Sequence, residues 1–136
     1  MPRVYRVMTN ENGRPLVGES SRALGIRPGY DIRVNDDGSV EPGKGGMSVS
    51  PQWQLLPHFL IPRRLRDRIP KAAGNNNDAC WAMHDGDFQS GPLTAELVLH
   101  VDRPIHGTVQ PARSMLLNEY ETALAATRDA WRIDEV

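Results

Sequence analysis

Three short segments carry the side chains that could bind or transform a ligand. In the first, Val4-Tyr5-Arg6-Val7, an arginine stands among strand-forming residues. A guanidinium can hold a phosphate through two parallel hydrogen bonds, so Arg6 is a candidate anion-binding residue. If the segment forms an edge strand, the same side chain only faces solvent.

The second segment is Gly43-Lys44-Gly45-Gly46-Met47-Ser48-Val49-Ser50. Ser48 and Ser50 are two residues apart, so on a strand both hydroxyls face the same side. Glycines allow a ligand to approach the backbone closely. The segment is not a P-loop, because Lys44 lies inside the glycine run and no Gly-Lys-Ser/Thr sequence follows. A tight turn before a strand explains the same residues equally well.

The third segment is His106-Gly107-Thr108-Val109-Gln110-Pro111-Ala112-Arg113-Ser114-Met115. A histidine that enters a strand leading to a helix start is well placed to meet a ligand. Its imidazole can change protonation near neutral pH. A lone histidine can equally be a structural residue, and the sequence leaves both interpretations open.

Other polar clusters favour structural roles. The spacing of His84-Asp85-Gly86-Asp87 matches no zinc or EF-hand pattern, so we predict no metal site. The basic run 63–71 could contact phosphates, although a solvated face explains it as well. The single cysteine, Cys80, cannot form an internal disulfide and has no base beside it, so we predict that it packs in the interior. Glu119 and Glu121 lie on different faces of an expected helix and form no acid/base pair.

Short strands must position these segments. Residues 93–101 carry apolar side chains at one parity, which is typical of a strand, and residues 114–129 carry them at helical spacing, with Ser114 as the expected cap. Residues 20–24 are compatible with one helical turn. Further strands are expected at 3–9, 31–34, 47–50, 58–61, 80–83 and 105–110. Residues 131–133 form either a terminal strand or a docking segment. No strand–helix alternation appears, so we predict a single α+β domain over residues 1–136 with a mostly antiparallel sheet.

Composition and charge narrow the function classes. The formal charge is −1, which argues against a dedicated nucleic-acid binder. Basic side chains exceed acidic ones by four in residues 1–68, and acidic ones exceed basic by five in residues 69–136, so the first half could present an anion-binding face. No apolar run is long enough to span a membrane, and no apolar stretch follows Met1–Met8, so we expect neither a transmembrane segment nor a signal peptide.

Taken together, the three segments resemble the ADP-ribosyltransferase fold. The resemblance is closest to the ADP-ribosyltransferase-like effector toxins of type VI secretion systems. Those chains combine a Leu-Tyr-Arg strand, a Gly-Gly-x-Ser-Val strand and a His-x-Thr-Ile-x-Pro-Ala-Lys-x-Met segment in the same order as Val4-Tyr5-Arg6, residues 45–49 and residues 106–115 here. Residues 55–100 match no known pattern. The resemblance implies a split, mostly antiparallel β-sheet with a C-terminal helix.

The resemblance also implies a site and a ligand. It implies that the protein is a bacterial toxin that binds NAD and transfers ADP-ribose to an unidentified macromolecule. It assigns Ser48 and Ser50 to ordering of the ribose and of the catalytic site, and His106 to the same site as an adenosine or ribose contact. Four further residues would bind the cofactor, with the first holding its phosphates: Arg6, Gly45, Gly46 and Thr108.

The sequence departs from the arginine-type pattern at the catalytic acid. Thr108 stands where those enzymes carry a glutamate, and no acid lies between Asp102 and Glu119. Either a carboxylate reaches in from elsewhere, from Glu96, Glu119 or Glu121, or the chemistry is not standard transfer.

Partners and location follow from the same resemblance. A toxin that acts in the cytoplasm, or that reaches a target cell without a signal peptide, needs a small immunity or antitoxin protein that covers its cleft in the producing cell. The other interpretation is a non-catalytic interaction domain, such as an antitoxin or an adaptor, which would need no catalytic acid.

Overall fold

Strand β1 (Val4–Glu11) is the element around which the chain is organised. A computed structural model describes residues 1–136. In it, β1 pairs antiparallel with β5 (Asp78–Met83), from Val4 opposite Met83 to Thr9 opposite Asp78. The short strands β2 (Arg14–Pro15) and β10 (Arg132–Ile133) complete a four-stranded sheet in the order β10-β5-β1-β2.

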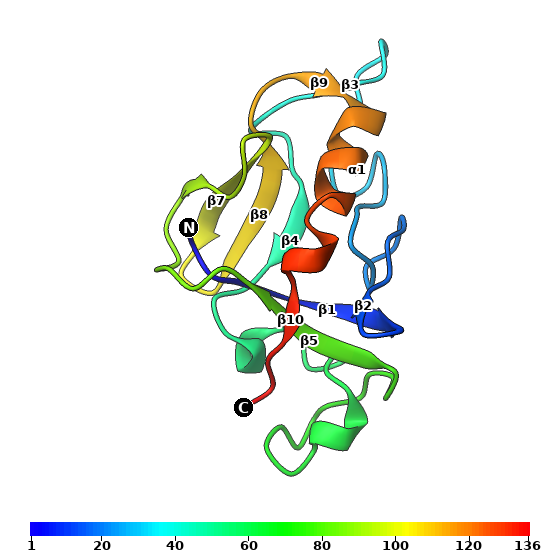
Figure 1. The fold of residues 1–136 in the computed structure, drawn as a ribbon, viewed down its shortest axis with the longest axis vertical. Coiled ribbons are helices and arrows are strands. Elements are labelled where there is room, and N and C mark those ends of the chain that lie inside the picture. Colours follow the sequence, from blue (N-terminus) through cyan, green and yellow to red (C-terminus); the bar gives the residue numbers. More distant parts are fainter.

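A second sheet of four strands holds the other candidate segments. Its order is β4-β8-β7-β6, and every pair in it is antiparallel. The strands are β4 (Met47–Val49), β6 (Gly91–Pro92), β7 (Leu97–Arg103) and β8 (His106–Pro111). A separate pair joins β3 (Ser39–Val40) to β9 (Met115–Leu116). Figure 1 shows β4, β7 and β8 above β1 and β5, with helix α1 (Leu117–Ala125) beside them.

Backbone pairing joins the two sheets at a single pair of residues. The Tyr5 N–H donates to the Ser50 carbonyl at 2.8 Å, and the Ser50 N–H donates to the Tyr5 carbonyl at 3.0 Å. This isolated bridge joins β1 to the end of β4, and the two strands then diverge. The molecule is therefore an α+β structure with a split antiparallel sheet and one C-terminal α-helix, as the sequence predicts.

Both faces of β1 and β5 are covered, because side chains alternate between faces along a strand. One face, with Val4 and Met8, joins a core cluster of 19 buried residues that includes the second sheet and α1. The opposite face, with Tyr5 and Val7, joins a second cluster of 10 residues. The second cluster is closed by residues 53–72, which contain two 3-10 turns, Trp53–Leu55 and Arg63–Leu65.

The helix is shorter than the sequence pattern predicts. It begins at Leu117, because Met115 and Leu116 extend as β9 and pair with β3. The Leu116 N–H is accepted by the Glu119 carboxylate at 3.1 Å, so Ser114 is not the cap. The apolar face is as expected: Tyr120 is fully buried, and its hydroxyl donates to the Val109 carbonyl at 2.5 Å.

Four expected elements are wrong in type or extent. Residues 31–34 form no strand, because Ile32 makes only isolated bridges, to Pro28 and to Gly45. Residues 58–61 form a turn between two prolines, in which the Ile61 N–H bonds to carbonyls of Pro57 and His58, so they are not a strand. Residues 93–96 belong to the turn that links β6 to β7, so the strand expected from residue 93 begins at Leu97. Residues 20–24 form no helical turn, because Leu24 bridges to Val17 instead. In segments this short, the contacts made in the folded protein determine the backbone conformation more than the local sequence does.

Candidate functional site

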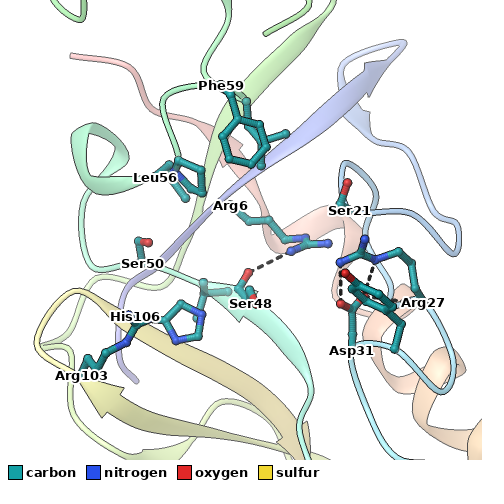
Figure 2. A pocket seen from close by; sticks show the side chains of 14 residues that line it. Arg6, Ser21, Arg27, Asp31, Ser48, Ser50, Leu56, Phe59, Arg103 and His106 are labelled. Carbon is teal, nitrogen blue, oxygen red and sulfur yellow. Dashed lines mark hydrogen bonds and ion pairs between the residues drawn. The ribbon is translucent and has the colours of Figure 1, made fainter. Parts of the chain in front are cut away.

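A cavity of about 500 Å³ opens where β1 and β4 diverge. Arg6 from β1, Ser48 from β4, Ser50 beyond it and His106 from β8 all line it. Figure 2 shows Arg6 among them, with Arg27 and Asp31 to one side and Ser50, His106 and Arg103 to the other. The structure therefore brings together an arginine, two serines and a histidine from the three sequence segments.

Arg6 is buried and bonded to backbone, with only 6% of its surface exposed. Its guanidinium donates to the carbonyls of Ala23 at 3.0 Å, Ser48 at 2.9 Å, Ser20 at 3.3 Å and Gly25 at 3.4 Å. No carboxylate pairs with it. Burial lowers its pKa to about 10, so it stays charged at neutral pH. Arg6 thus bridges the gap between the sheets. The alternative of a solvent-facing arginine on an edge strand is wrong, because the side chain is buried.

A second arginine of the cavity is paired. Asp31 accepts hydrogen bonds from the Arg27 backbone N–H at 2.7 Å and from its guanidinium at 2.8 and 3.1 Å. The same guanidinium lies 4.1 Å from the centre of the Tyr30 ring. Burial alone would raise the pKa of Asp31, but the bonds from Arg27 outweigh it and lower the pKa. This pair lies outside the three candidate segments, although the four-residue spacing of Arg27 and Asp31 across Pro28-Gly29 is a sequence signal for it.

The turn between β7 and β8 adds one more polar side chain to the cavity and positions His106. Arg103 lies opposite His106 across the turn, lines the cavity and has no ion-pair partner. The imidazole Nδ1 of His106 lies 2.7 Å from the Asp102 carboxylate. Burial would raise the pKa of Asp102, but the hydrogen bond and charge of His106 outweigh it, so the pKa lies below its usual value.

An apolar wall completes the cavity. It comes from the turn after the first 3-10 turn: Leu56, Pro57, Phe59 and Leu60. Phe59 is 70% exposed, and Tyr30 on the other side is 77% exposed. Aromatic side chains with a free face can stack on a planar ligand group. This wall was missed because residues 58–61 read as a strand and matched no known pattern.

Gly45, Gly46 and Thr108 do not line the cavity, so their expected contact with a cofactor is not supported. A Cβ atom at Gly45 would lie 2.3 Å from the Asp31 carbonyl, and one at Gly46 would lie 2.3 Å from the Val109 carbonyl. These glycines allow backbone to pack against backbone. The Thr108 hydroxyl accepts a hydrogen bond from Gln110 at 2.9 Å, farther along β8.

The carboxylates expected to replace the missing acid also lie elsewhere. Glu96 pairs with Arg113 at 2.6 Å on another surface, and neither Glu119 nor Glu121 lines the cavity. Asp31 is the only carboxylate among the lining residues, and Arg27 holds it.

The basic run contacts the chain's own C-terminal segment. Arg64 pairs with Glu135 at 2.7 Å, and the Arg68 guanidinium lies 5.2 Å from the centre of the Trp53 ring. The Cys80 N–H also donates to the Glu135 carboxylate, at 3.1 Å. Cys80 itself is buried as predicted, and burial raises the pKa of its thiol to about 12. Arg64 and Arg68 of the run therefore have structural partners, whereas Arg63 and Lys71 are exposed.

The remaining polar features are structural. His84 has φ of 66°, and its ring lies 2.9 Å from the Leu93 carbonyl. No group of three or more His, Cys, Asp or Glu side chains is arranged to hold a metal ion. None of the helices has the length and apolar character needed to cross a membrane.

Comparison with known families gives one match. A family model described as Tse2 ADP-ribosyltransferase toxin matches residues 4–131, which include every residue that lines the cavity. No curated protein and no solved structure matches the chain.

Proposed function

The chain belongs to the Tse2 ADP-ribosyltransferase toxin family, and from this premise we propose that it binds NAD and transfers ADP-ribose to a macromolecule in the cytoplasm of a target cell. The observation that carries this proposal is the cationic cavity at the split of the sheet. There, the buried charge of Arg6 has no carboxylate partner. A buried charge without a counter-ion favours an anionic ligand.

The charges of the cavity suit a diphosphate. Three guanidinium groups, from Arg6, Arg27 and Arg103, face one carboxylate, from Asp31, so the lining has a positive surplus. Arg103 makes no hydrogen bond within the protein, whereas the Arg6 guanidinium donates four to backbone carbonyls and the Arg27 guanidinium donates two to Asp31. We therefore assign the phosphate contact mainly to Arg103, with Arg6 contributing charge. This revises the role first expected for Arg6.

The other walls suit the remaining parts of NAD. Neither the Ser48 nor the Ser50 hydroxyl has a protein partner, and both residues line the cavity, so they can bind a ribose. The Phe59 and Tyr30 rings can stack on a base. The volume of about 500 Å³ lies in the usual range of ligand sites. When bound, NAD supplies the ADP-ribosyl group and nicotinamide as the leaving group.

We also propose that the protein is a type VI secretion effector, for which the toxin family is the support. A small immunity protein would neutralise it in the producing cell. The exposed Phe59 and Tyr30 beside the cavity offer such a protein an apolar contact.

Calorimetry with NAD and an assay of nicotinamide release test the proposal. We expect the wild-type protein to bind NAD and release nicotinamide, and Arg103→Gln to weaken binding at least tenfold. Arg113→Gln is the matched control, because Arg113 is also exposed but pairs with Glu96 away from the cavity. A wild-type protein that neither binds nor consumes NAD and is tolerated on expression would favour the non-catalytic interaction domain.

A further inference from the structure

We propose that Asp102 positions His106 as the proton acceptor for a hydroxyl nucleophile in the cavity, an inference that rests on the proposed function. The two side chains form a close pair, with 2.7 Å between the Asp102 oxygen and the imidazole Nδ1. Nδ1 therefore carries the proton that it donates to the carboxylate. In the neutral ring, this leaves Nε2 with a free lone pair. No protein group contacts Nε2 through a hydrogen bond, and His106 lines the cavity.

An irregularity in the sheet creates this pair. Val101 lies opposite Gly107 and Arg103 lies opposite His106, so the register shifts at Asp102, which has no partner in the ladder. Such bulges redirect side chains and are common beside active sites. Here, the bulge turns Asp102 back toward the imidazole, while Arg103 and His106 both line the cavity. Figure 2 shows His106 between Arg103 and Ser48.

The rest of the lining offers no competing proton acceptor. Asp31 is its only carboxylate, and three hydrogen bonds from Arg27 hold it. The arginines of the lining remain protonated, so they cannot accept a proton. Apart from the arginines, the imidazole of His106 is the only nitrogen base of the lining, and its Nε2 makes no hydrogen bond.

The same charges select the class of acceptor. A cationic guanidinium acceptor would meet a surplus of positive charge and find no free carboxylate.

A hydroxyl is neutral, but it must lose its proton when it attacks. Nε2 takes that proton while the oxygen forms a bond to the ribose carbon of NAD. The bond from that carbon to nicotinamide breaks, and its electron pair leaves with neutral nicotinamide. The Asp102 carboxylate then stabilises the imidazolium.

Nitrogen-15 NMR of the imidazole rings tests the positioning without NAD. In the wild-type protein, we expect His106 to carry its proton on Nδ1, with the signal assigned by its loss in His106→Gln. Asp102→Asn should abolish this preference, and Asp102→Glu should restore part of it. Asp36→Asn makes the same chemical change in an exposed turn and should have no effect. A wild-type ring protonated on Nε2 would overturn the proposal.

Nicotinamide release tests the chemistry. Asp102→Asn should lower kcat roughly 100-fold, the scale of general-base catalysis, with little change in KM for NAD. Methanol, a hydroxyl acceptor, should yield methyl ADP-ribose, and agmatine, a guanidinium acceptor, should yield no adduct. An unchanged kcat in Asp102→Asn, or formation of ADP-ribosyl-agmatine, would overturn the proposal. If the wild-type protein releases no nicotinamide, the proposed function fails, and the NMR result still decides whether Asp102 positions His106.

Discussion

The guanidinium of Arg6 has five N–H groups, and four of them donate to backbone carbonyls. Replacement by methionine would leave those carbonyls without partners inside the protein. We expect Arg6→Met to destabilise the fold by about 3 kcal/mol or more, measured by urea unfolding. Arg103→Gln should stay within about 0.5 kcal/mol of wild type, because Arg103 is exposed and unpaired. Equal stability of wild type and Arg6→Met would contradict the bridging role.

The two oxygens of Ser48 have different roles. Its carbonyl accepts a hydrogen bond from Arg6, while its hydroxyl has no partner in the protein. Ser48→Ala should change the unfolding free energy by less than about 1 kcal/mol, since it breaks no hydrogen bond and opens no cavity. Growth inhibition on expression should nevertheless fall strongly. Ser114→Ala, at an exposed position that caps no helix, is the control for soluble protein level. Full toxicity of Ser48→Ala at wild-type abundance would remove this hydroxyl from the mechanism.

Glu121 gives a pH dependence with a defined sign. Burial, together with a hydrogen bond and charge repulsion from Glu19, raises its pKa from 4.5 to about 7. The folded state therefore binds this proton more tightly than the unfolded state does. The resulting stability is fully present below pH 4.5 and is lost as the pH rises through 7. Glu121→Gln should lose less stability than wild type between pH 5 and pH 8, measured by urea midpoints. Parallel pH profiles of the two proteins would refute this.

At the scale of elements, the hydroxyl of one side chain, Tyr120, links α1 to the second sheet through hydrogen bonds. The Tyr120 hydroxyl donates to the Val109 carbonyl and accepts the Met47 N–H at 3.2 Å, so it joins β8 and β4 to the helix. Tyr120→Phe keeps the ring but leaves both backbone groups without that partner. We expect a loss of about 1–3 kcal/mol in urea unfolding. Faster amide exchange of Met47 in the variant would localise the effect, and an unchanged exchange rate would argue against it.

The strands that the sequence predicts correctly are those with strong local signals. β1 is rich in β-branched and aromatic residues, β5 contains a short apolar run around Trp81, and β8 follows a clear turn. The meeting of Arg6, Ser48, Ser50 and His106 was implied by the resemblance to the ADP-ribosyltransferase-like toxins. Asp102, Arg27 and Phe59 could not be found in this way, because a bulge and two irregular turns place them.

At the scale of the whole molecule, the C-terminal segment closes the second core cluster. The Asp134 N–H donates to the Cys80 carbonyl, the Tyr5 hydroxyl donates to Asp134 at 2.7 Å, and the Trp53 ring N–H donates to the Val136 carbonyl at 3.0 Å. Removal of residues 134–136 should expose Cys80 and raise its rate of alkylation at least tenfold. Mass spectrometry of the only cysteine measures this directly. Equal rates for both proteins in denaturant provide the control, and equal rates in buffer would contradict the closing role.

The long separation between the strands that form the cavity has a consequence during synthesis on the ribosome. β1 is made first, but its partner β5 begins at residue 78, and the imidazole of the cavity arrives only with residue 106. Pairing between such distant segments is slow and must wait until both are outside the exit tunnel. A nascent chain of the first hundred residues therefore has no complete cavity. Translation of a truncated message should yield a harmless product, and the producing cell meets an assembled site only after most of the chain has emerged.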